Sequence, residues 1–191
     1  YMENVAMLAY ADFNDDSVYV STPSVLGKFP KKITPNYFSK GLNPFVFDSI
    51  RADVLYFDKT DSVLYAGNKT GLHLYKDRKK IQHRYASFNG LSFTDIDKDG
   101  QGIFIATTLG DGVFFFNKDT VLNLNEKSGL TDNMCTSLFM QNDSTVWVST
   151  LNGLNRILYN YSDGEFTGIK IRNFYRNDGL PSNYINDIYI Y

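Results

Sequence analysis

Five polar residues have side chains that could bind a polyhydroxylated ligand such as an oligosaccharide. They are Lys69, Asp111, Asn133, Asn152 and Asn183. Lysine donates hydrogen bonds, aspartate accepts them and asparagine does both, as recognition of sugar hydroxyl groups requires. Asn and Asp also occur in turns for conformational reasons alone. The five residues are therefore candidate ligand contacts, and the alternative is that they only shape their turns.

A calcium site is a second chemistry that the sequence suggests. Asp95, Asp97 and Asp99 precede Gly100 with the spacing of a calcium-binding loop, but the twelfth position of that loop is Ala106, where a bidentate Glu is required. A hairpin turn explains the same Asp and Gly residues without a metal ion. We therefore expect a turn at this place.

Nucleophilic catalysis is a third possibility. The single cysteine, Cys135, lies in an apolar segment, and neither His73 nor His83 has the sequence context of a catalytic base. We expect Cys135 to be a buried strand residue. The sequence contains no serine elbow, phosphate-binding loop or metal-binding motif. We therefore predict no catalytic residue, no metal ion and no cofactor for this chain.

The elements that must position these residues are repeats. A Gly-Leu pair recurs at residues 41, 90, 129 and 179, at intervals of 39 to 50 residues. A second glycine recurs at Gly71, Gly112 and Gly153, each 41 residues after the last, and Ser24 takes its place in the first unit. Repeats of this length are typical of propeller blades and longer than two-helix repeats of about 34 residues.

The fourth unit predicts four short antiparallel strands, at residues 135–140, 146–149, 154–159 and 168–174. These runs are rich in β-branched and aromatic residues, and polar or glycine-containing turns separate them. No segment of the chain keeps a helical period. We therefore predict an all-β fold, a β-propeller of four-stranded antiparallel blades over residues 1–191. The predicted blades are at about 5–42, 43–91, 92–130 and 131–180, with the start of a further blade at 181–191.

Composition limits the partners of the chain. The formal net charge of the 191 residues is −2, and there is no block of Lys or Arg. Nucleic acid is therefore not an expected partner. The sequence has no run of 18 apolar residues and no signal peptide. We expect the remaining blades of a larger ring, and any membrane anchor, to lie in the same polypeptide outside this segment.

Residues 137–156, followed by Gly179-Leu180-Pro181-Ser182-Asn183, resemble the two-component regulator propeller repeat. That repeat has a strand, a polar turn, an Ile-Trp-Ile-Gly-Thr segment, a Gly-Leu pair and a later Gly-Leu-Pro-Ser-Asn segment. Trp147 matches its tryptophan, and we align Tyr19, Leu64 and Phe104 with it in the other units. We expect Trp147 to pack between sheets.

The resemblance implies a ligand-sensing propeller, seven-bladed when complete, in the periplasmic sensor region of a hybrid two-component histidine kinase of the kind found in Bacteroidetes. It implies an oligosaccharide as the cue, a homodimeric full-length sensor, and no catalytic activity in this segment. A secreted propeller lyase or another carbohydrate-active enzyme is the alternative, because one fold supports many functions. An intracellular scaffold is disfavoured because the Gly-His and Trp-Asp pairs of WD40 blades are absent from the sequence.

Overall fold

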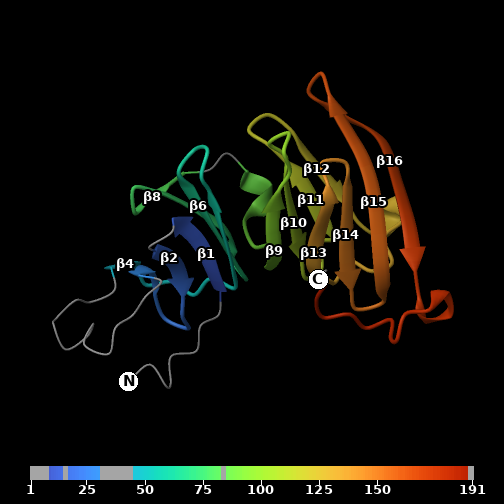
Figure 1. Ribbon diagram of the computed structural model, residues 1–191, viewed down its shortest axis with the longest axis horizontal. Helices are drawn as coiled ribbons and strands as arrows, with labels where there is room; N and C mark the ends of the chain where they lie inside the picture. The colour runs from blue at the N-terminus through green and yellow to red at the C-terminus, as the bar shows by residue number, and fades with distance from the viewer. Residues whose placement is uncertain (1–8, 15–16, 31–44, 83–84, 189–191) are drawn as a thin grey trace. The chain divides into compact units, whose positions relative to one another are not determined.

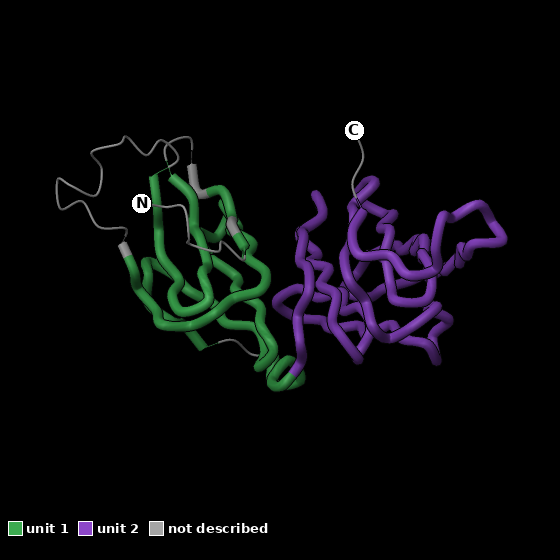
Figure 2. Tube along the Cα trace, turned by 90° about the horizontal axis from the view of Figure 1, so that it is seen from below, with its two compact units in different colours: residues 1–90 green, residues 91–191 purple. Residues whose placement is uncertain are grey.

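The computed structural model describes residues 9–14, 17–30, 45–82 and 85–188. These residues form four antiparallel sheets, each of four strands (Figure 1). The chain divides into two compact units, residues 1–90 and 91–191, which Figure 2 shows in different colours. In every sheet the strand order follows the chain order, so each sheet is an antiparallel meander.

The first unit contains the first and second sheets. The first sheet has β1 (Ala9–Asn14), β2 (Ser17–Ser21), β3 (Leu26–Pro30) and β4 (Phe45–Asp48). The second sheet has β5 (Val54–Asp58), β6 (Val63–Asn68), β7 (Gly71–Lys76) and β8 (Lys79–Ile81). A short 3-10 helix, η1 (Ala86–Phe88), follows β8.

The second unit contains the third and fourth sheets. The third sheet has β9 (Phe93–Lys98), β10 (Phe104–Thr108), β11 (Val113–Phe116) and β12 (Val121–Leu124). The fourth sheet has β13 (Cys135–Asn142), β14 (Thr145–Thr150), β15 (Gly153–Ser162) and β16 (Glu165–Phe174). The 3-10 helices η2 (Glu126–Ser128) and η3 (Arg176–Asp178) follow the two sheets. The described residues contain no α-helix, and none of their helices is long and apolar enough to cross a membrane.

The four strands predicted for the fourth unit are confirmed, and each lies inside an observed strand. Strands β15 and β16 are ten residues long, beyond the predicted ends, because their pairing continues from Asn160↔Thr167 to Ser162↔Glu165. Asn160 is a turn-type residue, so the sequence suggested an earlier end. The turn lies instead at Asp163, which has a φ of 53°.

One kind of turn joins the first and second strands of three sheets. The side chains of Asp58, Asp99 and Asn142 each accept a hydrogen bond from the backbone N–H two residues later, at 3.0, 2.9 and 3.0 Å. An Asp or Asn side chain stabilises a turn in this way by replacing a backbone acceptor. This role explains why these residue types recur at one place in the repeat.

The glycine that begins the third strand lies where no side chain fits. Gly112 and Gly153 have φ values of +79° and +134°. A Cβ atom on Gly153 would lie 2.9 Å from the carbonyl oxygen of Phe174, and one on Gly112 would overlap the carbonyl oxygen of Leu124. The backbone of the fourth strand therefore passes directly against the start of the third strand.

The first sheet makes the corresponding turn without a glycine. Ser21 pairs with Leu26 as Ser149 pairs with Leu154, so Val25, and not Ser24, occupies the place of the glycine. The backbone N–H of Thr22 donates to the carbonyl oxygen of Val25 at 2.9 Å, at the place where Thr150 pairs with Gly153 in the fourth sheet.

The core of the second unit lies between its two sheets. Strands β10 and β11 direct Ile105, Val113 and Phe115 towards Val148 and Tyr159 of the fourth sheet, and all five side chains are buried. The ring centroids of Phe115 and Tyr159 are 5.0 Å apart in an edge-on arrangement. The third and fourth sheets thus pack through the apolar side chains on the faces that they turn towards each other.

A smaller core lies in the first unit. Leu26 of the first sheet and Leu64 of the second sheet belong to one buried cluster, in which the Tyr19 and Phe47 rings make an edge-on contact at 5.9 Å. The Ser21 hydroxyl also accepts a hydrogen bond from Ala52 N–H at 2.8 Å. The Tyr75 hydroxyl of β7 donates to the Asp48 carboxylate of β4, so apolar packing and hydrogen bonds hold these two sheets together.

The boundary between the first two blades differs from the prediction. Strand β4 pairs with β3, although residues 43–48 lie in the range predicted for the second blade. The Gly-Leu pairs at 90, 129 and 179 come after the fourth strand of a sheet, whereas the pair at 41 comes before β4. The pair at 41–42 lies outside the described residues. It is therefore not a fourth copy of the same marker.

Trp147 lies on the face of its sheet that points away from the core of the second unit, so its packing between sheets remains a prediction. It alternates with Val146 and Val148, which are fully buried in the core, so the indole lies on the opposite face of the sheet. There it is half-buried, and its Nε1 donates to the side-chain oxygen of Gln141 at 2.9 Å. In the described residues Trp147 does not pack between two sheets.

Strand register also corrects the alignment of Trp147 with the other units. Trp147 pairs with Arg156, two residues into the third strand from Leu154. The equivalent pairs in the first three sheets contain Tyr19, Tyr65 and Ile105. Leu64 and Phe104 each lie one residue before the equivalent position, and so on the other face of their sheets.

Residues 184–188 do not form the strand predicted there, although they lie beside β13. The Thr136 hydroxyl donates to the carbonyl oxygen of Ile185 at 2.7 Å, and the Ser137 hydroxyl donates to Asp187 at 2.8 Å. These bonds come from side chains of β13, whereas a strand needs a backbone ladder. The segment therefore contacts the sheet without extending it.

The core of the second unit can be tested at Phe115. Phe115→Ala is expected to lower the free energy of unfolding by about 3–5 kcal/mol, because it leaves a cavity against Tyr159. Val121→Ala, at a strand position that is 42% exposed, is the control and should change it by less than about 0.5 kcal/mol. Urea unfolding followed by circular dichroism measures both. Equal losses for the two variants would contradict the assignment of the core.

Candidate functional site

One edge of the second unit brings several candidate residues together. The backbone N–H groups of Gly110 and Gly112 donate to the carbonyl oxygen of Asn133, at 3.1 and 3.0 Å, and Leu151 N–H donates to that of Met134 at 3.1 Å. The turns after β10 and β14 therefore lie against the connection from the third to the fourth sheet. This edge carries three of the five predicted contacts, Asp111, Asn133 and Asn152.

Asp111 and Asn152 have exposed side chains at this edge. The hydrogen bonds of both residues involve backbone atoms: Asp111 accepts through its carbonyl oxygen from Asn123 Nδ2 at 2.8 Å, and Asn152 donates its N–H to Thr150 Oγ1 at 3.1 Å. Among the described residues neither side chain has a hydrogen-bond partner, so both could bind a ligand.

Asn133 and Asn183 have a conformational role that repeats between the two sheets. Asn133 Oδ1 accepts from Glu126 N–H at 2.8 Å, and Asn183 Oδ1 accepts from Arg176 N–H at 2.7 Å. Glu126 and Arg176 are the first residues of η2 and η3. Asn133 Nδ2 also donates to Glu126 Oε2 at 3.0 Å, whereas Asn183 Nδ2 has no hydrogen-bond partner in the part of the chain that the structure describes. Of the two amides, Asn183 thus keeps a group for a ligand.

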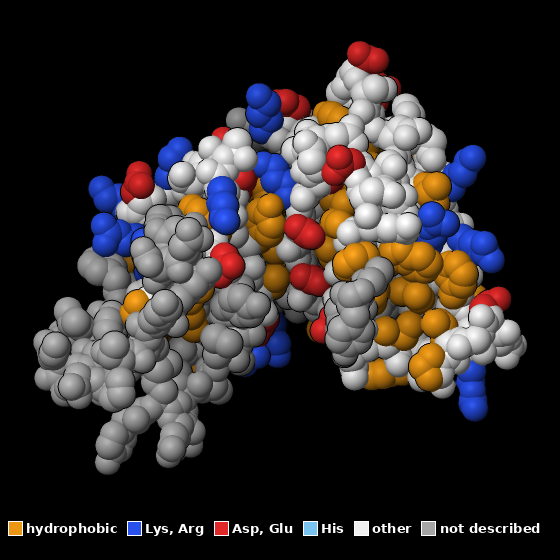
Figure 3. Space-filling model, in the orientation of Figure 1, with side chains coloured by type: hydrophobic (Ala, Val, Ile, Leu, Met, Phe, Trp, Pro, Cys, Tyr) orange, Lys and Arg blue, Asp and Glu red, His pale blue; other side chains and the backbone are white. Residues whose placement is uncertain are grey.

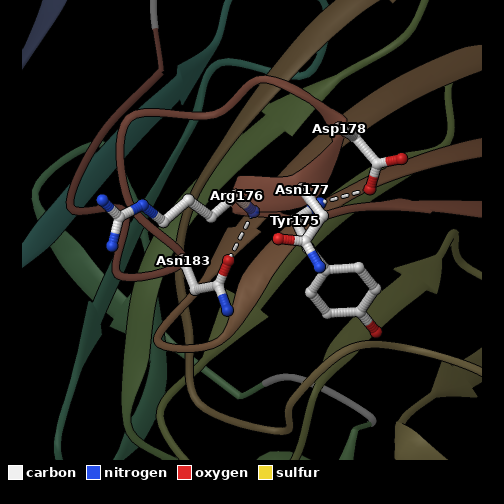
Figure 4. A pocket seen from close by; sticks show the side chains of 5 residues that line it. All are labelled: Tyr175, Arg176, Asn177, Asp178 and Asn183. Carbon is white, nitrogen blue, oxygen red and sulfur yellow. Dashed lines mark hydrogen bonds between the residues drawn. The ribbon is translucent and has the colours of Figure 1, made fainter.

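Asn183 also lines an open pocket of about 470 Å³ beside η3. The other lining residues are Tyr175, Arg176, Asn177 and Asp178. Figure 4 shows the Arg176 and Tyr175 side chains extending to opposite sides of η3, while Asp178 Oδ2 accepts from Tyr175 N–H at 2.9 Å. An aromatic ring, a guanidinium, amides and a carboxylate make this pocket suitable for a polar ligand with several hydroxyl groups.

The sequence analysis identified only Asn183 among these lining residues. Residues 175–178 stand directly before the Gly179-Leu180 marker, as 125–128 stand before Gly129-Leu130, and in both places they form a 3-10 turn. The signal that could have identified these residues is their place directly before the Gly-Leu pair of each repeat. The side chains at this place differ between the two repeats, as expected of residues that contact a ligand.

Lys69 belongs to the first unit, whereas the other four candidates belong to the second. It lies exposed in the turn between β6 and β7. Its neighbour Thr70 lines a second pocket of about 480 Å³ with His73 and Lys80, and Thr70 Oγ1 lies 3.3 Å from His73 Nε2. Lys69 itself does not line this pocket.

The aspartates at 95–99 belong to the predicted hairpin. Asp99 Oδ1 accepts from the backbone N–H groups of Gln101 and Ile103, at 2.9 and 2.7 Å, and Asp99 Oδ2 accepts from the Tyr159 hydroxyl at 2.8 Å. Protein donors therefore occupy both oxygens. Within the described ranges no group of three or more His, Cys, Asp or Glu residues could hold a metal ion.

Asp95 links β9 to β13. Its Oδ2 accepts from Leu138 N–H at 2.9 Å and from the Ser137 hydroxyl at 3.0 Å. Burial raises the pKa of Asp95, these hydrogen bonds oppose that rise, and the negative charge of Asp187 adds to it. Because a serine hydroxyl has one hydrogen, Ser137 donates to either Asp95 or Asp187 at any moment. The carboxylate thus serves the contact between the sheets.

Cys135 is a structural residue, as expected. Its side chain is fully buried, and burial raises the pKa of its thiol to about 12. The thiol is therefore protonated at neutral pH and is not a nucleophile. His73 lies in the other unit, and His83 lies outside the described residues.

No protein-family model and no curated protein matches the chain. Solved structures do match. An extracellular domain of the hybrid two-component system BT3049 from B. thetaiotaomicron aligns with a TM-score of 0.71 over 98% of this chain, at 19% identity. The extracellular domain of BT4673 from the same organism gives a TM-score of 0.59 over 99% of this chain, at 16% identity. Virginiamycin B lyase from Staphylococcus aureus gives 0.54 over 86% at 10% identity.

These structures, together with the WD40 β-propeller domain of Doa1 (TM-score 0.58), establish the fold. The four sheets are blades of a β-propeller, and extracellular domains of hybrid two-component systems are among the structures that share it. The chain spans 24% of the BT3049 domain, 33% of the BT4673 domain and 55% of the lyase.

The burial of Cys135 predicts its reactivity. A thiol reagent at pH 8 should modify Cys135 at least ~100-fold more slowly in the native chain than in urea, because a thiol with a raised pKa forms little thiolate and is not accessible. A Glu165→Cys variant in a Cys135→Ala background is the exposed control and should react at similar rates in both solvents. Equal native and urea rates for Cys135 would show that β13 is not packed as described.

Proposed function

We propose that this chain is part of the ligand-sensing propeller of a hybrid two-component histidine kinase and lies on the periplasmic side of the membrane. The observation that carries the proposal is the TM-score of 0.71 over 98% of the chain with an extracellular domain of such a system. The residues around Trp147 and the Gly-Leu-Pro-Ser-Asn segment at 179–183 support it, because they resemble the repeat of these sensors.

The proposed ligand is an oligosaccharide. Its contacts would be the free side chains of Asp111 and Asn152 and the pocket of Tyr175, Arg176 and Asn183, which lie on loops of the second unit. A propeller supports function through loops of this kind on a rigid scaffold. Lys69 and Asn133 remain weaker candidates, since Lys69 lies in the other unit and Asn133 holds η2.

The segment itself would not catalyse a reaction. In this proposal ligand binding changes the conformation or association of a homodimeric sensor, and the signal reaches a kinase elsewhere in the polypeptide. A secreted lyase is the second candidate, because the fold matches virginiamycin B lyase with a TM-score of 0.54. Fold alone does not decide between them.

The full-length protein distinguishes these functions. We expect a membrane-spanning segment and a histidine kinase domain in the same polypeptide, and a change in autophosphorylation in membrane vesicles when one member of an oligosaccharide panel is added. Cleavage of an oligosaccharide by the purified protein, with no kinase domain in the polypeptide, would favour the lyase and contradict the proposal.

The binding edge can be tested by calorimetric titration of the complete extracytoplasmic region with the oligosaccharide that the panel identifies. Asp111→Ala and Asn152→Ala should each weaken binding about 5-fold through loss of a hydrogen bond, and Arg176→Ala about 10-fold or more because its group is charged. Glu165→Ala, an exposed residue at the other end of β16, is the control and should not change affinity. Unchanged affinity in all three test variants would place the ligand elsewhere.

A further inference from the structure

The fourth sheet has a face with four large apolar side chains, which the described residues leave open except where residues 184–188 contact β13. We call it the outer face. It consists of two rows across the strands, Phe139–Trp147–Arg156–Arg172 and Ser137–Ser149–Leu154–Phe174. The large side chains of these rows are only half-buried, apart from Arg172, which is exposed. Figure 3 shows hydrophobic side chains gathered over β14–β16, with Lys and Arg side chains beside them.

The same rows of the third sheet are covered. They are Asp97–Ile105–Phe115–Leu122 and Asp95–Thr107–Val113–Leu124. Ile105, Val113 and Phe115 are fully buried in the core that the third and fourth sheets share. The third sheet therefore packs this face against the fourth sheet, and the equivalent face of the fourth sheet is the outer face.

Residues 184–188 make the contacts that begin such a successor. Thr94 Oγ1 of the third sheet donates to the carbonyl oxygen of Cys135 at 3.0 Å, and Thr136 Oγ1 of the fourth sheet donates to that of Ile185 at 2.7 Å. Thr94 and Thr136 hold equivalent positions, and so do Cys135 and Ile185, 50 residues later. The segment is thus placed like the start of β13.

Arg156 shows what chemistry the covering element must have. It occupies the place of Phe115, its guanidinium lies 5.7 Å from the Trp147 ring, and its Nε is buried without a hydrogen-bond partner. Covering the outer face would bury the guanidinium further, and a buried unpaired charge is strongly destabilising. The covering element therefore needs an acceptor at Arg156, and a carboxylate is the acceptor that pairs with guanidinium best.

We propose that the next blade expected in the ring, which would begin with residues 184–188 and cover the outer face, directs a carboxylate towards Arg156. The proposal is independent of the sensor function. It rests on the repeated register, on the repeated Thr-to-carbonyl bonds and on the unsatisfied Nε atom.

Cysteine labelling tests the contact. Leu154→Cys in a Cys135→Ala background should react at least ~100-fold more slowly with a maleimide in the full-length protein than in the 191-residue chain, because the further blade excludes the reagent. Glu165→Cys in the same background is the exposed control and should react equally in both. Equal rates for Leu154→Cys would overturn the proposal, as would a natural polypeptide with no four-stranded unit after residue 188. A labelling rate of Leu154→Cys that falls as the concentration of the 191-residue chain rises, with no slower labelling in the full-length protein, would show that a second copy of the chain binds this face instead.

Arg156→Leu tests the carboxylate. It should lower the unfolding temperature of the full-length protein by about 5 °C or more, because the facing carboxylate loses its partner. The shift in the 191-residue chain should be below about 2 °C, as should that of the control Lys127→Leu in either protein. If the Arg156→Leu full-length protein unfolds at the same temperature as the wild type, the proposal that a carboxylate faces Arg156 is wrong.

Discussion

The second, third and fourth repeats depend on a close approach of two backbone segments at the start of the third strand. At Gly112 and Gly153 a Cβ atom would lie too close to a carbonyl oxygen of the fourth strand. Gly71 has the same restriction, since a Cβ atom there would lie 2.8 Å from the carbonyl oxygen of Phe88. This approach fixes the turn after the second strand, and through it the edge on which Asp111 and Asn152 lie. The only residue without a Cβ atom is glycine, which explains its interval of 41 residues.

The sequence was sufficient to predict the architecture because strand patterns and turn glycines are local signals. It predicted all four strands of the fourth sheet and the hairpin at Asp99. It did not predict the end of the first sheet, because the Gly-Leu pair at 41 imitates a marker whose place depends on pairing with β3. The alignment of Leu64 and Phe104 with Trp147 was wrong for a similar reason, since a shift of one residue reverses the side of a strand.

The candidate site was predicted less well than the fold. Asp111 and Asn152 are exposed and free, but Asn133 is used to hold η2, and an Asn in a loop looks the same in both roles. The pocket residues beside η3 became visible only from their positions in space. The outer face of the fourth sheet could also not be predicted from the sequence alone. Only the pairing register shows that Arg156 holds the place of the buried Phe115.

The central claim, that close backbone approach defines the repeat, is tested most directly by comparing Gly112→Ala with Gly110→Ala. Both glycines lie in one turn with positive φ, +79° and +120°, but no atom lies within 4 Å of a Cβ built on Gly110. Backbone strain alone would make Gly110→Ala at least as costly as Gly112→Ala, at about 1–3 kcal/mol. Urea unfolding should show a clearly larger loss for Gly112→Ala, because its new methyl group displaces the Leu124 backbone. An equal or smaller loss for Gly112→Ala would contradict the claim.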